Sequence, residues 1–226
     1  IMNRLLAFGC SHTYGESLPD CLTTKSLEAP MPPPSQFAWP NLLAKKLNRE
    51  CVNLGSCGAS NKQIHYNIVN TNFEKDDLVL VLWTHHSRSC FLQNEPIDEK
   101  GLQFKQLTPS YTKIFKQNPR WRRVYNYRYY ELFHTEENSR YETQLSIDHS
   151  YCYLLKKGIK NFHFTFDRKG ERPITSKFTK EMDAWVSAPI HNLDLLEDTG
   201  ADRLHPGMSA QDDLAEKILA RIENQI

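Results

Sequence analysis

Residues 78–83 read Leu-Val-Leu-Val-Leu-Trp, an uninterrupted apolar run that is the clearest strand candidate in the sequence. A strand with one face in water alternates apolar and polar residues, whereas a strand that is apolar at every position is covered on both faces. Strands of this second kind occupy the middle of parallel sheets, which carry helices on each side. The run therefore predicts a central parallel sheet.

Strands and helices alternate outward from this run. The segments 4–8, 51–54 and 162–166 are short and apolar or alternating, as is typical of strands. Helical patterns occupy 37–47, 64–69, 120–134, 137–157 with Gly158 as its C-cap, 177–186, and a last segment that Pro206 opens. Because right-handed crossovers place helices on both faces of a parallel sheet, this order predicts a three-layer α/β/α sandwich. We expect one domain over 1–226, with a variable insertion around 94–135.

The overall composition narrows the class of protein. The 226 residues are 39% hydrophobic and carry 28 Lys and Arg against 27 Asp and Glu, for a net charge of +1. A core is therefore expected, and no global field attracts nucleic acid or an anionic membrane. The six cysteines form no Cys-x-x-Cys pair, and neither a signal-peptide pattern nor a run of about 18 apolar residues is present. These observations predict a cytoplasmic protein with reduced thiols and no obligatory nucleic-acid or membrane partner.

Four short polar segments stand where predicted strands end or where the last helix begins, at residues 9–13, 55–58, 84–88 and 202–206. The carboxyl ends of parallel strands meet at one edge of the sheet, and ligands bind there. In order and spacing these segments resemble the four sequence blocks of the SGNH (GDSL-like) hydrolase superfamily. The resemblance covers the order of elements over most of the chain, and residue identity only within the blocks. It implies a flavodoxin-like sandwich with serine-hydrolase chemistry at that edge.

The resemblance also implies a role for each matching residue. Ser11 stands at the position of the nucleophile, Gly58 at that of the second-block glycine, and Asp202-x-x-His205 at the final block. A serine hydroxyl attacks only when an imidazole takes its proton, and a carboxylate fixes the tautomer of that imidazole. His205 is then the base, Asp202 its orienting partner, and the N–H groups of Ser11 and Gly58 are two oxyanion donors. The expected substrate is a small acyl ester, first of all an O-acetylated carbohydrate, and no cofactor or metal is required.

Two positions depart from the family's blocks. Cys10 stands where the first block has aspartate, and residues 83–86 read Trp-Thr-His-His where the third block has Gly-x-Asn-Asp. The missing asparagine normally donates to the oxyanion, and loss of one such donor lowers the rate by about 10²–10³-fold. His85 falls on that position and is predicted to replace the asparagine, with Asn61 and Arg88 as nearby alternatives.

Plainer roles are expected for four neighbouring side chains. Polar residues at strand ends are often solvated loop residues, so His12 and His86 are predicted to be solvated or to contact substrate. Cys10 and Cys57 are predicted to be small, buried and inert.

A basic and aromatic segment at 119–130 suggests other functions. It interleaves Arg with Trp and Tyr, as do surfaces that stack on sugars or single-stranded nucleic acid. We predict that Trp121 and Tyr125 border the substrate, and ordinary packing of an amphipathic helix is the alternative. The alternative to an esterase is a catalytically weak SGNH-like module that binds glycan or nucleic acid. A third alternative is a metal-dependent hydrolase, in which N and O ligands gather at the strand ends. Its ligands would come from His12, His85, His86, Asp202 and His205.

Overall fold

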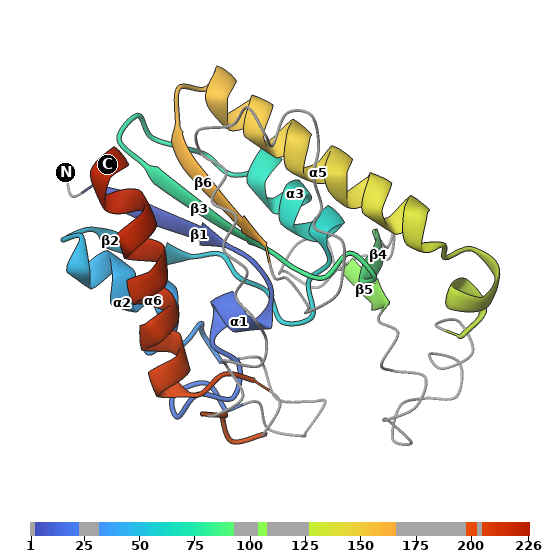
Figure 1. Cartoon of the computed structure of the whole chain (residues 1–226), viewed down its shortest axis with the longest axis horizontal. Coiled ribbons are helices and arrows are strands. Elements are labelled where there is room, and N and C mark those ends of the chain that lie inside the picture. Colours follow the sequence, from blue (N-terminus) through green and yellow to red (C-terminus); the bar gives the residue numbers. More distant parts are fainter. Residues whose placement is uncertain (1–2, 23–31, 93–103, 108–126, 166–197, 203–204) are drawn as a thin grey trace.

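A four-stranded parallel sheet forms the centre of the described part of the molecule (Figure 1). The computed structural model describes residues 3–22, 32–92, 104–107, 127–165, 198–202 and 205–226. The strand order β2-β1-β3-β6 corresponds to Glu50–Asn53, Arg4–Phe8, Leu78–Trp83 and Lys160–Thr165. The apolar run of β3 thus lies between β1 and β6, and all six of its residues are buried. The predicted central parallel strand is confirmed.

Alternate residues of β3 belong to two separate hydrophobic cores, because successive side chains of a strand point to opposite faces. Even-numbered residues pack with α2 (Trp39–Lys46) and α6 (Met208–Ile222). Odd-numbered residues pack with α3 (Asn61–Val69) and α5 (Glu136–Lys156). Figure 1 shows these two pairs of helices on opposite sides of the sheet. The predicted three-layer α/β/α sandwich is confirmed.

The last helix begins later than predicted. We expected Pro206 to open it, but α6 begins at Met208. Pro206 instead forms an isolated bridge with Thr199, and Gly207 is the N-cap residue. The difference has a physical cause, since a distant carboxylate, that of Asp198, accepts hydrogen bonds from the first turn of the helix. Gly158 does follow α5 as predicted, with a left-handed φ of +69°.

An antiparallel pair of strands was not predicted at all. β4 (Ser89–Leu92) pairs with β5 (Phe104–Leu107) beyond the end of β3. A single helical turn, α1 (Ser11–Tyr14), also went unpredicted. Of the predicted helix at 120–134, residues 127–132 are helical, whereas 120–126, with Trp121 and Tyr125, lie outside the described residues, as does the predicted helix at 177–186.

Two expectations, the absence of a membrane span and the single domain, concern the whole chain. Across the described ranges, no helix combines the length and apolar character that crossing a bilayer would need. The single domain over 1–226 with an insertion around 94–135 stays a prediction. All six cysteines, each of which lies in a described range, are free.

His163 is a fully buried histidine in β6, on the α5 side of the sheet. Its Nδ1 accepts a hydrogen bond from Trp83 Nε1 at 3.0 Å, so the ring proton lies on Nε2, which donates to Asn161 Oδ1 at 2.9 Å. Burial lowers the pKa of His163 from 6.5 to about 3. The folded protein therefore holds this imidazole neutral throughout the mildly acidic range.

We expect His163 to make stability fall on acidification. Below pH 6.5 the unfolded chain binds a proton at this residue that the folded chain does not bind until the pH is near 3, so the free energy of unfolding decreases across that window. The slope approaches about 1.4 kcal/mol per pH unit, and the loss between pH 7 and pH 5 is about 2 kcal/mol. In His163→Gln the amide can replace both hydrogen bonds without titrating. Urea unfolding at pH 7 and pH 5 should show a smaller loss for this variant, and equal losses in both proteins would contradict the assignment.

Candidate active site

The chain turns sharply where β1 ends, and this turn places Ser11 at the carboxyl edge of the sheet. Cys10 precedes α1 as its N-cap residue, and Ser11 is the first residue of the turn and 2% exposed. Gly9 lacks room for a side chain, since a Cβ there would lie 2.0 Å from Thr13 Oγ1 and 3.1 Å from the carbonyl oxygen of Leu82. The close approach of α1 to β3 at this point therefore depends on glycine.

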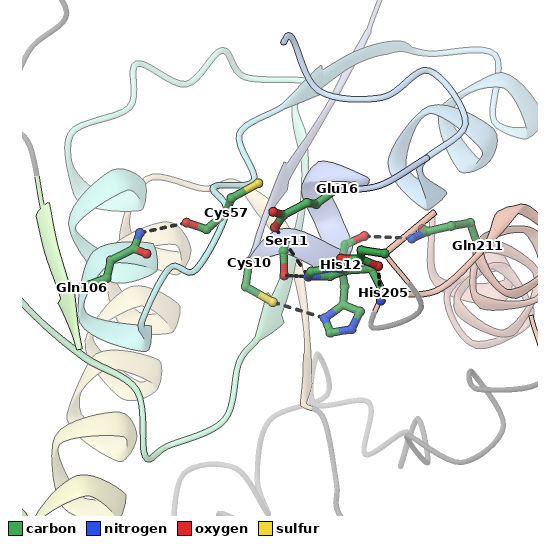
Figure 2. A network of polar contacts seen from close by, with 9 residues as sticks. Cys10, Ser11, His12, Glu16, Cys57, Gln106, His205 and Gln211 are labelled. Carbon is green, nitrogen blue, oxygen red and sulfur yellow. Dashed lines mark hydrogen bonds and ion pairs between the residues drawn. The ribbon is translucent and has the colours of Figure 1, made fainter. Parts of the chain in front are cut away.

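Ser11, His205 and Asp202 form a continuous line of contacts. His205 Nε2 lies 2.9 Å from Ser11 Oγ, and His205 Nδ1 lies 2.6 Å from Asp202 Oδ2. Figure 2 shows the His205 ring directed at the Ser11 hydroxyl. A carboxylate only accepts hydrogen bonds, so the ring proton lies on Nδ1, and Nε2 presents a lone pair to the serine. The three predicted residues are thus brought together, although Ser11 and His205 are 194 positions apart in the sequence.

Hydrogen bonds to neighbouring elements hold the loop that carries Asp202 and His205. Asp198 accepts hydrogen bonds from Ser209 N at 2.7 Å and Ser209 Oγ at 2.6 Å, and the hydroxyl bond lowers the pKa of Asp198. The carbonyl of Ser17 accepts from Ala201 N at 3.0 Å. These contacts tie the loop to α6 and to the segment after α1. His205 therefore keeps its position relative to Ser11.

A second carboxylate, which sequence analysis missed, reaches His205 from the other side. Glu16 Oε2 lies 3.5 Å from His205 Nε2, the nitrogen that faces Ser11. Glu16 follows Gly15, whose left-handed φ of +83° ends α1 and turns the chain back. A Gly in this position is the only sequence signal that would have pointed to the turn.

The loop after β2 lies beside the nucleophile. Ser56 N donates to the carbonyl of Gly9 at 3.0 Å, which fixes the loop two residues from Ser11. Gly58 has a φ of +73°, and a Cβ there would lie 2.0 Å from Gln106 Oε1. Gln106, on the unpredicted strand β5, also donates to the carbonyl of Cys57 at 2.9 Å (Figure 2). The left-handed backbone conformation favours glycine at Gly58, whereas the Gln106 side chain could move aside for a Cβ.

The side chain of Asn61 makes hydrogen bonds that hold the fold together. It is 2% exposed, and its Nδ2 donates to the carbonyl of Thr84 at 2.9 Å and to Thr143 Oγ1 at 3.1 Å. Its Oδ1 accepts from Thr84 N at 2.8 Å. Both amide hydrogens are thus engaged in holding the end of β3 against α3 and α5. To act as an oxyanion donor, Asn61 would have to release one of these bonds.

The turn after β3 holds the remaining predicted residues. His85 Nδ1 accepts from Ser87 N at 3.2 Å and lies 2.5 Å from Ser87 Oγ, so the proton of the neutral ring is on Nε2. His86 is only 8% exposed and stacks on His85 with ring centroids 4.4 Å apart. The expectation that His86 is solvated is therefore wrong, and its alternative, contact with substrate, stays a prediction. Arg88 has a buried Nη1 with no hydrogen-bond partner among the described residues.

Comparison with solved structures shows which known fold this architecture has. A G-D-S-L-family protein from Desulfitobacterium hafniense DCB-2 matches over 97% of this chain and 99% of its own, with 12% identity and a TM-score of 0.51. This chain has the SGNH (GDSL-like) hydrolase fold. Est2A, an acetyl xylan esterase from Butyrivibrio proteoclasticus, matches over 99% of this chain and 64% of its own, with 12% identity and a TM-score of 0.57. A catalytic mutant of Axe2, an acetylxylan esterase from Geobacillus stearothermophilus, matches over 97% and 94%, with 13% identity and a TM-score of 0.50. No protein-family model matches the sequence, and a search of curated proteins finds no match either.

Within this SGNH fold, Cys10 is less inert than predicted. It is fully buried, as expected, but its Sγ lies 3.5 Å from His12 Nδ1 (Figure 2). Burial raises the pKa of the Cys10 thiol, yet the hydrogen bond with His12 and the charges of His12 and Arg88 outweigh it and hold this pKa well below its ordinary value. The residue before Ser11 is thus a buried thiol whose pKa is lowered. At Cys57, burial raises the pKa, in line with the inert role predicted.

The ligand set of the metal-dependent alternative does not form in the described part of the chain. No group of three or more His, Cys, Asp and Glu side chains is arranged there to hold an ion. His205 uses one ring nitrogen toward Asp202 and the other toward Ser11, and His12 lies against Cys10. The geometry therefore does not favour the metal-dependent alternative.

Proposed function

We propose that this protein is a serine esterase that cleaves a small acyl ester, with Ser11, His205 and Asp202 as its catalytic triad. The single observation that carries the proposal is the pair of contacts at His205, 2.9 Å to Ser11 Oγ and 2.6 Å to Asp202 Oδ2. These distances match the nucleophile-to-base and base-to-orienter contacts that acyl transfer requires. The esterases among the solved structures of the same fold add to this support.

The protonation of the His205 ring, with its hydrogen on Nδ1, determines the steps of the proposed reaction. Ser11 Oγ attacks the ester carbonyl carbon while its proton passes to His205 Nε2, and Asp202 stabilises the imidazolium that results. When the tetrahedral intermediate collapses, the bond to the alcohol oxygen breaks and Nε2 returns the proton to that oxygen. A water then attacks the acyl-serine by the same route, which releases the acid and restores Ser11.

The oxyanion donors proposed are the N–H groups of Ser11 and Gly58 together with His85 Nε2–H. The backbone of Gly58 approaches the site without a side chain, and the tautomer of His85 leaves its donor hydrogen on Nε2. Because Asn61 is engaged with Thr84 and Thr143, His85 and Arg88 are the better candidates for the third donor.

An O-acetylated carbohydrate is the substrate we propose. Two of the structures of this fold belong to enzymes named for acetyl xylan, and both cover nearly all of this chain. That Trp121 and Tyr125 border such a substrate stays a prediction. The contacts at His205 favour catalysis over a module that only binds glycan or nucleic acid.

An active-site phosphonate probe tests the proposal directly. A fluorophosphonate should form one covalent adduct with the protein, because only an activated serine displaces its fluoride, and peptide mass mapping should place the adduct on Ser11. Ser17 lies in the same tryptic peptide, so fragment ions must separate the two serines. The Ser11→Ala variant and heat-unfolded protein are the controls. Equal labelling of the Ser11→Ala variant would overturn the proposal.

A further inference from the structure

Glu16 is held beside the proposed nucleophile by an unusual turn. The N–H groups of Gly15 and Glu16 both donate to the carbonyl of Ser11, at 2.9 and 3.1 Å. Gly15 has a φ of +83°, and Ser17 has a φ of +71°, a conformation that a residue with a side chain rarely adopts. The carbonyl of Ser17 also anchors the His205 loop through Ala201 N. Glu16 thus lies between two residues with left-handed backbone conformation, and the second of them, Ser17, is hydrogen-bonded to the loop that carries His205.

The carboxylate of Glu16 lies on the reactive side of His205. Its Oε2 is 3.5 Å from His205 Nε2, whereas Asp202 contacts Nδ1 on the opposite side of the ring. Figure 2 shows Glu16 and His205 meeting at the Ser11 hydroxyl. The Glu16 side chain is 21% exposed, so water or a substrate can reach it. The triad mechanism assigns it no step.

Two thiols and a phenol feel the charge of Glu16. Burial raises the pKa of Cys57, and the charge of Glu16 and a hydrogen bond with it raise it further. Burial raises the pKa of Tyr14 to about 12 and that of Cys21 to about 11, with Glu16 adding to both shifts. These three groups are therefore uncharged at neutral pH. They add no second negative charge to that of Glu16. The positive charges of His12 and Arg88 act on Cys10, and the His12 ring centroid lies 5.6 Å from that of His205.

We propose that Glu16 is a specificity-determining residue that makes the site prefer esters whose alcohol carries a positive charge and reject those whose alcohol carries a negative charge. The inference rests on the proposed function. In that reaction the departing alcohol oxygen takes its proton from His205 Nε2, so it must lie within hydrogen-bond distance of this atom. The rest of the alcohol then lies within a few ångströms of Glu16 Oε2, close enough for a charge on it to be felt. Among acetylated sugars, this favours neutral sugars and amino sugars over uronic acids.

Three matched acetate esters test this preference. Their alcohols are choline, its uncharged tert-butyl analogue, and an analogue of the same chain length that ends in a carboxylate. Relative to the uncharged ester, Glu16→Gln should lower kcat/KM for the choline ester about tenfold and raise it for the carboxylate ester by a similar factor. Glu16→Asp keeps the charge and should keep the direction of both preferences. Glu223→Gln removes one carboxylate at the C-terminal end of the chain, beyond α6, and should leave both ratios unchanged.

The outcomes separate the two proposals. If wild-type protein hydrolyses none of the esters and takes up no phosphonate, the proposed esterase function fails. If it hydrolyses them and Glu16→Gln leaves both ratios as they were, or lowers all three rates equally, the role of Glu16 in specificity is overturned. The ionic strength gives a second measurement that needs no variant. Added salt screens a partly exposed charge, so the three wild-type kcat/KM values should converge. If the ratios between these kcat/KM values do not change with salt, the proposal is also overturned.

Discussion

Replacing Ser11 or His205 by alanine is expected to lower kcat for an aryl acetate by about 10⁶-fold in either variant, and the double variant should be scarcely worse. The reason is that the serine and its base act as one unit: an unactivated hydroxyl does not attack, and a base without a nucleophile has nothing to deprotonate. Because His205 Nε2 lies 2.9 Å from Ser11 Oγ, the loss of either residue removes the catalytic function of both. Steady-state kinetics of the three variants against wild type measures this non-additivity.

Matched controls are available on α5, away from the site. Ser146→Ala and His149→Ala remove the same side chains from a helix on the other face of the sheet, and each should keep nearly all activity. The melting temperature of Ser11→Ala should stay close to that of wild type, so that loss of activity is not loss of fold. Multiplicative losses in the double variant, or wild-type turnover in Ser11→Ala, would refute the paired roles.

The central strands and the order of the layers could be predicted because they depend on local pattern. An apolar run such as Leu78–Trp83 can be satisfied only inside a sheet covered on both faces, whatever the rest of the chain does. The start of α6 was misplaced because the carboxylate that accepts from its first turn belongs to Asp198, nine residues before Gly207. The bridge between Thr199 and Pro206 brings Asp198 to the helix. The β4–β5 hairpin was missed because each of its strands has only four residues and more than ten residues separate them.

The site was predictable to the extent that its residues stand at strand ends. Ser11, Gly58 and His205 follow β1 and β2 or precede the last helix, and the carboxyl ends of parallel strands meet at one edge. Glu16 and Gln106 were not predictable in this way. The first reaches His205 only because Gly15 reverses the chain, and the second reaches the Gly58 loop from the missed hairpin.

Asp202→Asn is expected to lower kcat by about 10⁴-fold while leaving the fold intact. The asparagine Oδ1 can still accept from His205 N, the contact that Asp202 Oδ1 makes at 3.1 Å, so the loop should keep its shape. The amide would, however, donate to His205 Nδ1, which drives the ring proton to Nε2. A protonated Nε2 cannot take the proton of Ser11. Glu16 makes this worse, because its carboxylate at 3.5 Å from Nε2 favours a proton there.

The measurement is kcat together with the melting temperature, and the charge-matched control is Asp213→Asn on the outer face of α6, where the carboxylate contacts only Lys217 among the described side chains. Asp213→Asn should retain wild-type kcat. Adding Glu16→Gln to Asp202→Asn removes the group that stabilises the wrong tautomer, so the double variant should be no slower than Asp202→Asn alone. If Asp202→Asn stayed within tenfold of wild type, Asp202 would not be the residue that orients His205. Glu16, the other carboxylate within reach of the ring, would then have to hold the imidazolium, and the double variant would show it by a loss far larger than either single change.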